Sequence, residues 1–259
     1  MSGIQPIRSI TCRAPWASVG QELQCAARVQ RALFPPSFHT DTRFEVAAGV
    51  RPGGGMSGDF FDYTDANSEL RLVVGDACGK GVPAALQAAV VQGMLTTEEA
   101  DAAGGPARMV RHLNRLLCRR LIPDRQVTLV YAVITADHRL TYCNAGHSSP
   151  LLVSADSVRE LGIGGPPVGR YVDAQYEEAP IAIGPGDFLL IVSDGTTVPP
   201  RRWERRPPSL CDGRLLEMVR AQRPATAKEV LDHVLTDMSA FNDRPPEVDR
   251  TAVIVRCHS

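Results

Sequence analysis

The sequence is poor in the features that mark several common protein classes. Its 259 residues carry a net charge of −1, and only two lysines stand among the 28 basic residues. Without a basic surplus, the chain lacks the electrostatic signature of a nucleic-acid-binding protein. The seven cysteines are irregularly spaced and form no CxxC pair, which excludes a zinc ribbon and a thioredoxin-like motif. We therefore expect reduced thiols and no nucleic-acid partner.

Long apolar stretches are also missing. The first sixteen residues, MSGIQPIRSITCRAPW, do not contain the apolar segment of a signal peptide. The longest apolar runs, at 82–95 and 188–192, are shorter than the roughly 20 residues that cross a membrane as a helix. These absences predict a cytoplasmic protein without membrane contact. The 22 glycines and 20 prolines are too few for a low-complexity chain, so a folded core is expected.

Apolar residues follow helix and strand periods along most of the chain. Between residues 19 and 33 they recur at steps of three and four, which predicts an amphipathic helix that ends before Pro35-Pro36. The run 51–58 (RPGGGMSG) is expected to be flexible. Further helices are expected at 84–95, 109–121, 215–220 and 227–241. Strands are expected at 44–50, 70–74, 127–135, 140–144, 151–153, 176–183, 188–193 and 251–256.

The order of these elements indicates the fold class. Strands come in runs joined by hairpins, and helices are grouped at the start, middle and end of the chain. This pattern predicts an α+β fold with a mostly antiparallel sheet and argues against a doubly wound nucleotide-binding fold. Residues 1–18 are expected to form an irregular leader, and residues 19–259 a single domain that begins with the amphipathic helix at 19–34.

Four aspartates stand beside glycine or at a predicted strand end: Asp59, Asp76, Asp194 and Asp249. A strand end holds a carboxylate firmly, and a neighbouring glycine lets a ligand approach the backbone closely. Carboxylates that are brought together repel each other unless a cation neutralises them, and all-oxygen ligation suits Mg²⁺ or Mn²⁺. Each aspartate taken alone is also explained as a turn or cap residue.

Other motifs resemble catalytic sequences but lack a necessary part. The segment 75–81 (GDACGKG) has one residue too few for a Walker A loop and no hydroxyl after its lysine. Cys25 and Arg31 have the spacing of a cysteine phosphatase, but Cys25 lies inside a predicted helix. No serine has the G-x-S-x-G pattern of an acyl-enzyme nucleophile. His147 follows a glycine turn, where it is either a general acid or phosphate contact, or a residue that fixes the loop.

Eight motifs together resemble a known family. They resemble the PPM-type serine/threonine phosphatases, the protein phosphatase type 2C superfamily. Within it they are similar to the bacterial branch of the stage II sporulation E phosphatase and the stress-response sigma-factor regulators. The resemblance runs from about residue 19 to residue 256. In chain order the motifs are ARVQRALFPP (27–36), GDFFD (58–62), GDACGKGVPAAL (75–86), TLVYAV (128–133), NAGH (144–147), GGPPVG (164–169), SDG (193–195) and DRT (249–251).

The resemblance implies two packed antiparallel sheets flanked by helices, with two Mn²⁺ or Mg²⁺ ions between the sheets. On the matching positions, Asp76 bridges both ions and the Ala77 carbonyl adds a ligand. Asp59 and Asp194 complete the cluster, and Asp249, the acid retained from the last motif, is a further candidate metal ligand. The implied reaction is hydrolysis of phosphoserine or phosphothreonine by a metal-activated water, without a phosphoenzyme. The implied substrate is a phosphorylated regulatory protein of the anti-sigma-factor antagonist type.

The chain departs from the family pattern at positions that are usually acidic. Val248 replaces the first of two consecutive aspartates, and Val198 and Gly55 stand where acidic residues are common. Loss of anionic ligands weakens a site for a hard cation. The alternative function is therefore a catalytically impaired, phosphatase-like module that binds a signalling partner. The apolar stripe of helix 19–33 predicts either a homodimer contact or ordinary core packing.

Overall fold

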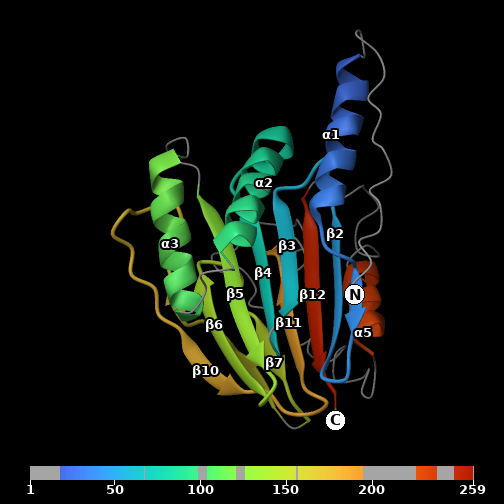
Figure 1. Cartoon of the computed structure of the whole chain (residues 1–259). Helices are drawn as coiled ribbons and strands as arrows, with labels where there is room; N and C mark the ends of the chain where they lie inside the picture. Colours follow the sequence, from blue (N-terminus) through green and yellow to red (C-terminus); the bar gives the residue numbers. More distant parts are fainter. Residues whose placement is uncertain are drawn as a thin grey trace, which may run out of the picture.

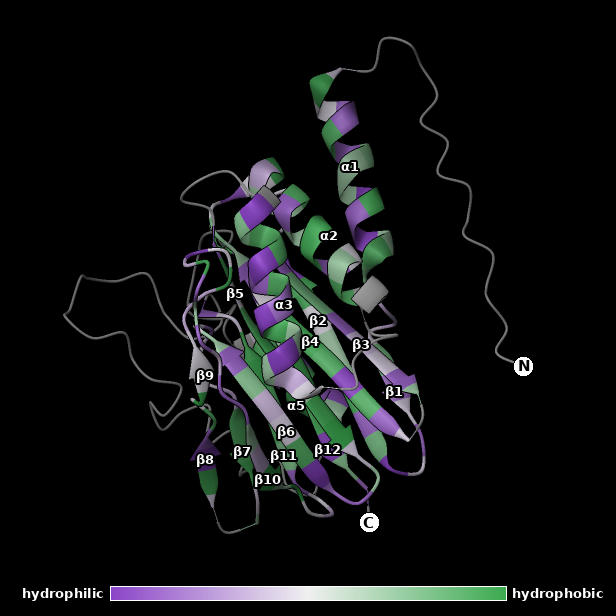
Figure 2. Cartoon of the chain, turned by 60° about the vertical axis from the view of Figure 1, so that its left-hand side comes forward, coloured by the Kyte–Doolittle hydropathy of each residue, from purple (hydrophilic) through white to green (hydrophobic). Residues whose placement is uncertain are grey.

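Two antiparallel sheets packed face to face form the centre of the molecule (Figure 1). The computed structural model describes residues 18–66, 68–98, 104–120, 126–155, 157–194, 226–237 and 248–258. Helices cover the outer faces of both sheets (Figures 1 and 2). The predicted α+β class, with two packed antiparallel sheets flanked by helices, is confirmed.

Sheet A has six strands in the described part of the chain. Every neighbouring pair in it is antiparallel. Its strands, in spatial order, are β1 (Phe38–Thr40), β2 (Phe44–Arg51), β12 (Arg250–Cys257), β11 (Phe188–Val192), β7 (Leu151–Val153) and β8 (Val158–Glu160).

Sheet B is an antiparallel meander with one short parallel addition. Its strands, in spatial order, are β10 (Ala179–Ala182), β6 (Arg139–Ala145), β5 (Val127–Thr135), β4 (Glu69–Ala77) and β3 (Asp59–Ala66). The two-residue strand β9 (Gly164–Gly165) pairs in parallel with the end of β6. Because β3 and β4 are antiparallel, the start of β3 lies beside the end of β4.

The helices divide between the two outer faces. Helix α2 (Gly81–Glu98) packs on β3 and β4, and helix α3 (Gly105–Arg120) packs on β5 and β6. On the other side, helix α5 (Ala227–Asp237) lies against β2 and β12. No helix in the described part of the chain is both long enough and apolar enough to span a membrane.

Helix α1 (Val19–Leu33) begins with a capping box. The Ser18 hydroxyl accepts a hydrogen bond from the Gln21 amide, and the Gln21 side chain accepts one from the Ser18 amide. Ser18 therefore belongs to the start of this helix and not to the leader. Ala27 packs against α2, whereas the N-terminal half of α1 projects beyond the sheets (Figure 2).

Alternation along the strands builds the separate apolar layers. In β4, Leu70, Leu72 and Val74 point toward sheet A and join the core between the sheets. Val73, on the opposite face, joins the layer beneath α2 and α3. Successive side chains of a strand point to opposite faces, so one strand buried on both sides supplies two cores. This explains why apolar residues stand at consecutive positions in β4, as Leu72, Val73 and Val74 do.

Most of the predicted elements are confirmed, with their ends moved by a few residues. One predicted strand, 176–183, is wrong at its start: only Ala179–Ala182 pair with β6. The Glu177 amide instead donates to the Gly164 carbonyl, beyond the end of the ladder. The run 51–58 is also not free: it begins with the last residue of β2, and three of its backbone amides are held by side chains.

Strand β3 is the main element that the sequence pattern did not predict. Its sequence does not alternate between apolar and polar residues, because the adjacent Phe60 and Phe61 are both apolar. Their side chains are buried on opposite faces of sheet B. The predicted helix at 215–220, residues 238–241 of the last helix and residues 1–17 of the leader lie outside the described residues.

Gly75 should be irreplaceable because the ring of Phe60 occupies the space above it. A Cβ atom at Gly75 would lie 2.5 Å from Phe60 Cζ and 2.9 Å from the Thr128 carbonyl oxygen. We expect Gly75→Ala to cost about 1–3 kcal/mol through overpacking. Each kcal/mol lowers Tm by about 2–4 °C in a domain of this size, which thermal unfolding measures.

The matched control is Gly93→Ala in helix α2, where nothing lies within 4 Å of the added atom. Alanine is favoured over glycine inside a helix by about 1 kcal/mol, so this variant should keep or raise Tm. Equal Tm values for the two variants would contradict the packing argument.

Candidate metal centre

Four aspartates from both sheets meet at one end of the sandwich. Asp59 begins β3 and pairs directly with Asp76, which is next to last in β4. Asp194 follows β11, and Asp249 precedes β12. The antiparallel pairing of β11 with β12 brings the last two together, because the end of one strand lies beside the start of the other.

Asp59 is held by hydroxyl groups from the opposite sheet. Its side chain is 2% exposed, and the Thr251 hydroxyl donates a 2.7 Å hydrogen bond to its Oδ2 atom. The Thr251 amide in turn donates to the Ser193 hydroxyl at 3.0 Å. The Asp59 amide donates to the Ser57 hydroxyl, also at 3.0 Å. Backbone and side chain of Asp59 are therefore both fixed.

The electrostatics of the cluster favour protonated carboxyl groups. Burial raises the pKa of Asp59 to about 7; hydrogen bonds from Thr251 and Ser193 oppose the rise, and the charges of Asp249 and Asp194 add to it. Burial likewise raises the pKa of Asp76 to about 8, with further contributions from Asp59, Asp194 and Asp249. The charges of Asp194 and Asp249 therefore add to the cost of ionising Asp59 and Asp76.

The Ala77 carbonyl lies against the loop that precedes β3. The Ala77 amide donates to the Gly58 carbonyl at 3.1 Å. A Cβ atom at Gly58 would lie 2.9 Å from the Ala77 carbonyl oxygen and 3.0 Å from Ala84 Cβ. Only glycine at position 58 lets the loop approach this closely. The backbone of Ala77 is thus beside Asp76 and Asp59.

The loop 53–58 is fastened from two directions. Asp249 accepts hydrogen bonds from the Gly53 amide at 2.8 Å and the Gly58 amide at 2.7 Å. Gln30 of helix α1 exchanges two hydrogen bonds with the Ser57 backbone, at 2.5 Å and 3.0 Å. Helix α1 therefore contacts the loop that leads directly into Asp59.

His147 is buried in the loop after β6. Its Nδ1 atom lies 3.0 Å from the Thr128 hydroxyl, and its backbone exchanges two hydrogen bonds with the Asn144 side chain. Burial lowers the pKa of His147 to about 4, so the ring is neutral at pH 7. Thr128 lies opposite Asp76 in the strand register. These contacts favour the loop-fixing interpretation of His147 over a phosphate contact.

Two of the three substituted family positions, Val248 and Gly55, belong to the described residues. The Val248 side chain is 41% exposed and precedes Asp249. A Cβ atom at Gly55 would meet nothing within 4 Å, so a longer side chain has room there. Val198 lies outside the described residues.

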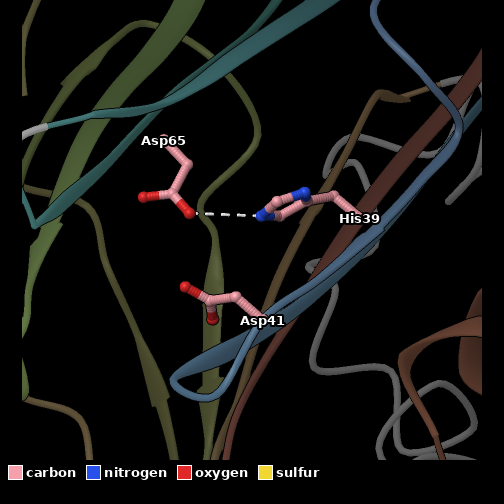
Figure 3. A group of neighbouring side chains, drawn as sticks. All are labelled: His39, Asp41 and Asp65. Atoms are coloured by element: carbon pink, nitrogen blue, oxygen red, sulfur yellow. Dashed lines mark hydrogen bonds and ion pairs between the residues drawn. The ribbon is translucent and has the colours of Figure 1, made fainter. Parts of the chain in front are cut away.

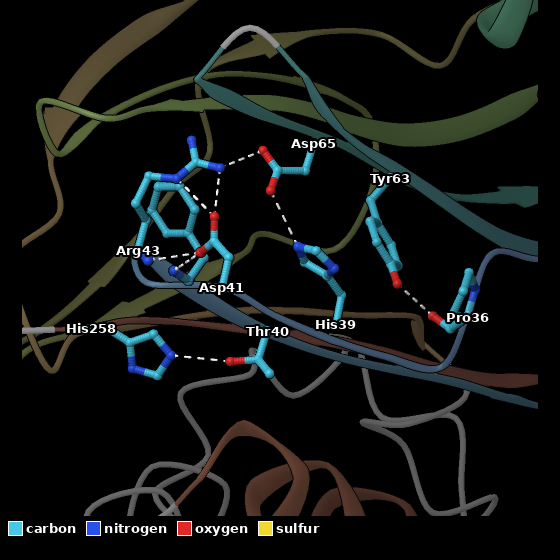
Figure 4. Close-up of polar contacts among 9 residues, drawn as sticks. Pro36, His39, Thr40, Asp41, Arg43, Tyr63, Asp65 and His258 are labelled. Carbon is cyan, nitrogen blue, oxygen red and sulfur yellow. Dashed lines mark hydrogen bonds and ion pairs between the residues drawn. The ribbon is translucent and has the colours of Figure 1, made fainter. Parts of the chain in front are cut away.

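A second group of possible ligands lies at the other end of β3. His39, Asp41 and Asp65 bring one ligand atom each within 4.8 Å of one another (Figure 3). Figure 4 shows that Arg43 already neutralises them: its Nη2 atom lies 2.6 Å from Asp41 Oδ2 and 2.5 Å from Asp65 Oδ1. This group is an ion-pair cluster that ties the β1–β2 turn of sheet A to β3 of sheet B.

The four-aspartate cluster has the composition of a site for divalent cations. Its donors are carboxylate oxygens and a backbone carbonyl, the ligands that Mg²⁺ and Mn²⁺ prefer. Asp59 is buried and hydrogen-bonded to neutral hydroxyl groups, and its acidic neighbours add negative charge. A cation offsets this repulsion, so the residues present fit such ions.

The comparisons with known proteins identify the family of the chain. The family model described as "Stage II sporulation protein E (SpoIIE)" matches residues 66–258. The chain belongs to the stage II sporulation protein E family. The resemblance drawn from its eight sequence motifs is therefore confirmed. Two similar proteins of Bacillus subtilis are named as phosphatases: the phosphoserine phosphatase RsbU and the PP2C phosphatase domain of SpoIIE.

The relatives are distant but cover much of the chain. The phosphoserine phosphatase RsbU of Bacillus subtilis is 23% identical over 95% of this chain and 73% of its own length. The SiaA-PP2C domain of Pseudomonas aeruginosa superimposes with a TM-score of 0.77 at 18% identity, over 92% of this chain and 96% of that domain. The catalytic domain of PstP, solved with two manganese ions, gives a TM-score of 0.63 at 14% identity, over 84% and 99%. The chain spans only 32% of IcfG of Synechocystis and 46% of RsbP of Bacillus subtilis.

Sequence reasoning missed the roles of three residues in this family site. Thr251 and Ser193 stand in quoted motifs, but their hydrogen bonds to Asp59 were not foreseen. Thr251 lies two residues after Asp249, on the same face of the chain, and that spacing could have identified it. Gln30 lies three residues after Ala27 on the buried face of α1, where a polar residue signals a partner.

The stability of the metal-free protein should fall as pH rises. The folded-state pKa values of Asp59 and Asp76, about 7 and 8, lie above the ordinary value of 3.8. The stabilisation from their protonation is complete below about pH 4 and is lost as pH rises through 7 and 8. We expect Tm in the presence of a chelator to decrease between pH 5 and pH 8.5.

Asp76→Asn should flatten this decrease, because it removes one titrating group and one negative neighbour of Asp59. The exposed Asp173, changed to asparagine, is the matched control and should leave the pH profile as in the wild type. Thermal unfolding across pH measures both. Parallel profiles for Asp76→Asn and the wild type would show that the cluster does not control this pH dependence.

Proposed function

We propose that the protein is a metal-dependent protein serine/threonine phosphatase. The observation that carries the proposal is the gathering of four aspartates at strand ends of two sheets. The buried Asp59 pairs with Asp76, and the charges of Asp194 and Asp249 raise the pKa of both. Family membership and the name of RsbU, a phosphoserine phosphatase, support the reaction class. We infer a phosphorylated regulatory protein of the anti-sigma-factor antagonist type as the substrate, in the cytoplasm.

The proposed chemistry divides between the ions and the chain. Two divalent cations, Mn²⁺ or Mg²⁺, would lower the pKa of a water that attacks phosphorus and would offset the charge on the leaving group. Asp76 and the Ala77 carbonyl would hold them from sheet B, and Asp59 and Asp194 would supply the remaining carboxylates. Asp249 accepts hydrogen bonds from the adjoining loop. Thr251 and Ser193 orient Asp59 through hydrogen bonds that span the two sheets.

The proposed reaction does not use a side chain as the nucleophile. Ser193 Oγ already accepts the Thr251 amide and faces Asp59, inside the sandwich. Cys25 lies within helix α1 and not in a loop of backbone amides, which agrees with rejecting a cysteine-phosphatase mechanism. Direct attack by water is therefore the simplest route, and no phosphoenzyme is expected.

Asp76→Asn should abolish phosphatase activity because Asp76 is the proposed bridging ligand. We expect hydrolysis of p-nitrophenyl phosphate and of a phosphoserine peptide to require Mn²⁺, to stop with EDTA and to fall at least about 100-fold in this variant, a loss of about 3 kcal/mol in barrier lowering. The control Asp173→Asn should retain wild-type rates. Activity unaffected by Asp76→Asn would refute the metal assignment.

The same variant separates the enzyme from the alternative, a binding module without catalysis. If wild type and Asp76→Asn both fail to hydrolyse either substrate but retain a phosphoprotein partner, the binding module is the correct interpretation. The exposed Val248, in place of an acidic ligand, is the observation behind that alternative.

We also propose that α1 forms a homodimer contact. Both sequence interpretations of its apolar stripe have structural support: Ala27 is buried against the domain, whereas Val19 is 73% and Leu23 43% exposed. Two exposed apolar residues one turn apart present a stripe that a second copy of the helix can cover. The stripe lies on the half of α1 that projects beyond the sheets (Figure 2).

Replacing Leu23 by glutamate should shift the protein from dimer to monomer, because a charge cannot be buried unpaired in an apolar contact. Light scattering at several concentrations measures the mass. Leu86→Glu, at a 61% exposed apolar position of α2, is the control and should stay dimeric. A wild-type monomer at all concentrations would exclude the dimer.

A further inference from the structure

Both carboxylate oxygens of Asp249 are occupied by the backbone of one loop. Oδ1 accepts from the Gly53 amide at 2.8 Å, and Oδ2 accepts from the Gly58 amide at 2.7 Å. The two amides stand at opposite ends of the loop 53–58, which crosses from sheet A to sheet B. One side chain therefore closes this loop at both ends.

Two helices also contact the loop. Gln30 of α1 holds Ser57, and Met56 packs with Ala27 of α1 and Ala85 of α2. Asp249 stands at the start of β12, so its two bonds join the loop directly to sheet A. They supplement the covalent link through the chain that leaves β2.

The position of Gly58 sets the position of two site groups. Asp59 is the next residue, and the Gly58 carbonyl accepts the hydrogen bond of the Ala77 amide at 3.1 Å. The space behind Gly58 is full, because a Cβ atom there would meet the Ala77 carbonyl oxygen at 2.9 Å. A displacement of Gly58 therefore moves the Asp59 backbone and the Ala77 carbonyl together.

Val248 has a different environment. Its side chain is 41% exposed and cannot bind a cation. At this end of β12 each carboxylate oxygen of Asp249 accepts a hydrogen bond from a backbone amide. Charge-assisted hydrogen bonds of this kind are stronger than neutral ones and fix geometry.

We propose that Asp249 is a positioning residue that clamps the loop 53–58 over the metal centre, and that the carboxylate ligand expected from β12 is missing at Val248. The metal assignment rests on the proposed phosphatase function, whereas the clamp does not. The wild-type protein consequently binds its second cation weakly. Of the two adjacent acidic positions in the last family motif, this chain keeps Asp249 and has a valine at position 248.

Hydrogen exchange of the metal-free protein tests the clamp independently of activity. The asparagine side chain in the Asp249→Asn variant has one acceptor oxygen, and its amide nitrogen would face an N–H donor. We expect the Gly53 and Gly58 amides to exchange on the order of tenfold faster in Asp249→Asn, the effect of losing a charge-assisted bond. Asp173→Asn should not change them. Equal protection of these amides in Asp249→Asn and wild type would overturn the clamp.

Calorimetric titration with Mn²⁺ tests the missing ligand. Val248→Asp should tighten the weaker Kd about tenfold or more, while Asp249→Asn should change it less than about threefold, although its kcat falls. If Asp249 is itself a ligand, Asp249→Asn weakens Kd at least about tenfold and Val248→Asp restores it in the double variant. That result would refute the positioning role.

The two arms also separate this inference from the proposed function. A wild-type protein that hydrolyses neither substrate but shows faster loop exchange in Asp249→Asn refutes the phosphatase and retains the clamp. If the wild type is active but the loop amides exchange equally fast in Asp249→Asn and wild type, the clamp is refuted and the phosphatase is retained. Val248→Asp leaves Asp249 in place, so it remains informative if Asp249→Asn fails to fold.

Discussion

The repulsion between Asp59 and Asp76 is the constraint on which the rest of the site depends. The two residues are direct neighbours across β3 and β4, and burial raises the pKa of both, as do the charges of the acidic cluster. Such a pair persists only where the backbone cannot relax. Here each residue is part of an antiparallel ladder, and a hydroxyl from the opposite sheet fixes Asp59. The sandwich therefore holds these carboxyl groups together in spite of their repulsion.

Close backbone approach is the second condition, and it explains the glycines that flank the aspartates. Gly58 lets the loop touch the Ala77 carbonyl, and Gly75 leaves room for the Phe60 ring on the adjacent strand. Both are placed one residue from an aspartate. A side chain at either position would push apart the two strands that carry Asp59 and Asp76. The close packing of β3 and β4 therefore also sets the distance between these two carboxyl groups.

Helix α1 joins a surface feature to the buried centre. Its N-terminal half has exposed apolar residues, while Gln30 near its C-terminal end is 5% exposed and bonded to the Ser57 backbone. Ser57 belongs to the loop that Asp249 also holds. The position of this helix and the geometry at Asp59 are thus connected through a short series of hydrogen bonds within one loop.

The sequence by itself determined the fold class, most of the strands and the identity of the acidic residues, because alternation and ordered motifs are local signals. It did not predict β3, since Phe60 and Phe61 are buried on opposite faces and local alternation cannot represent that. Nor could it show which groups Asp249 binds, because the loop 53–58 that supplies them is far away in the chain. Only the tertiary structure decided that Asp249 bonds to Gly53 and Gly58, and that Thr251 reaches Asp59, because these contacts join residues almost 200 positions apart in the chain.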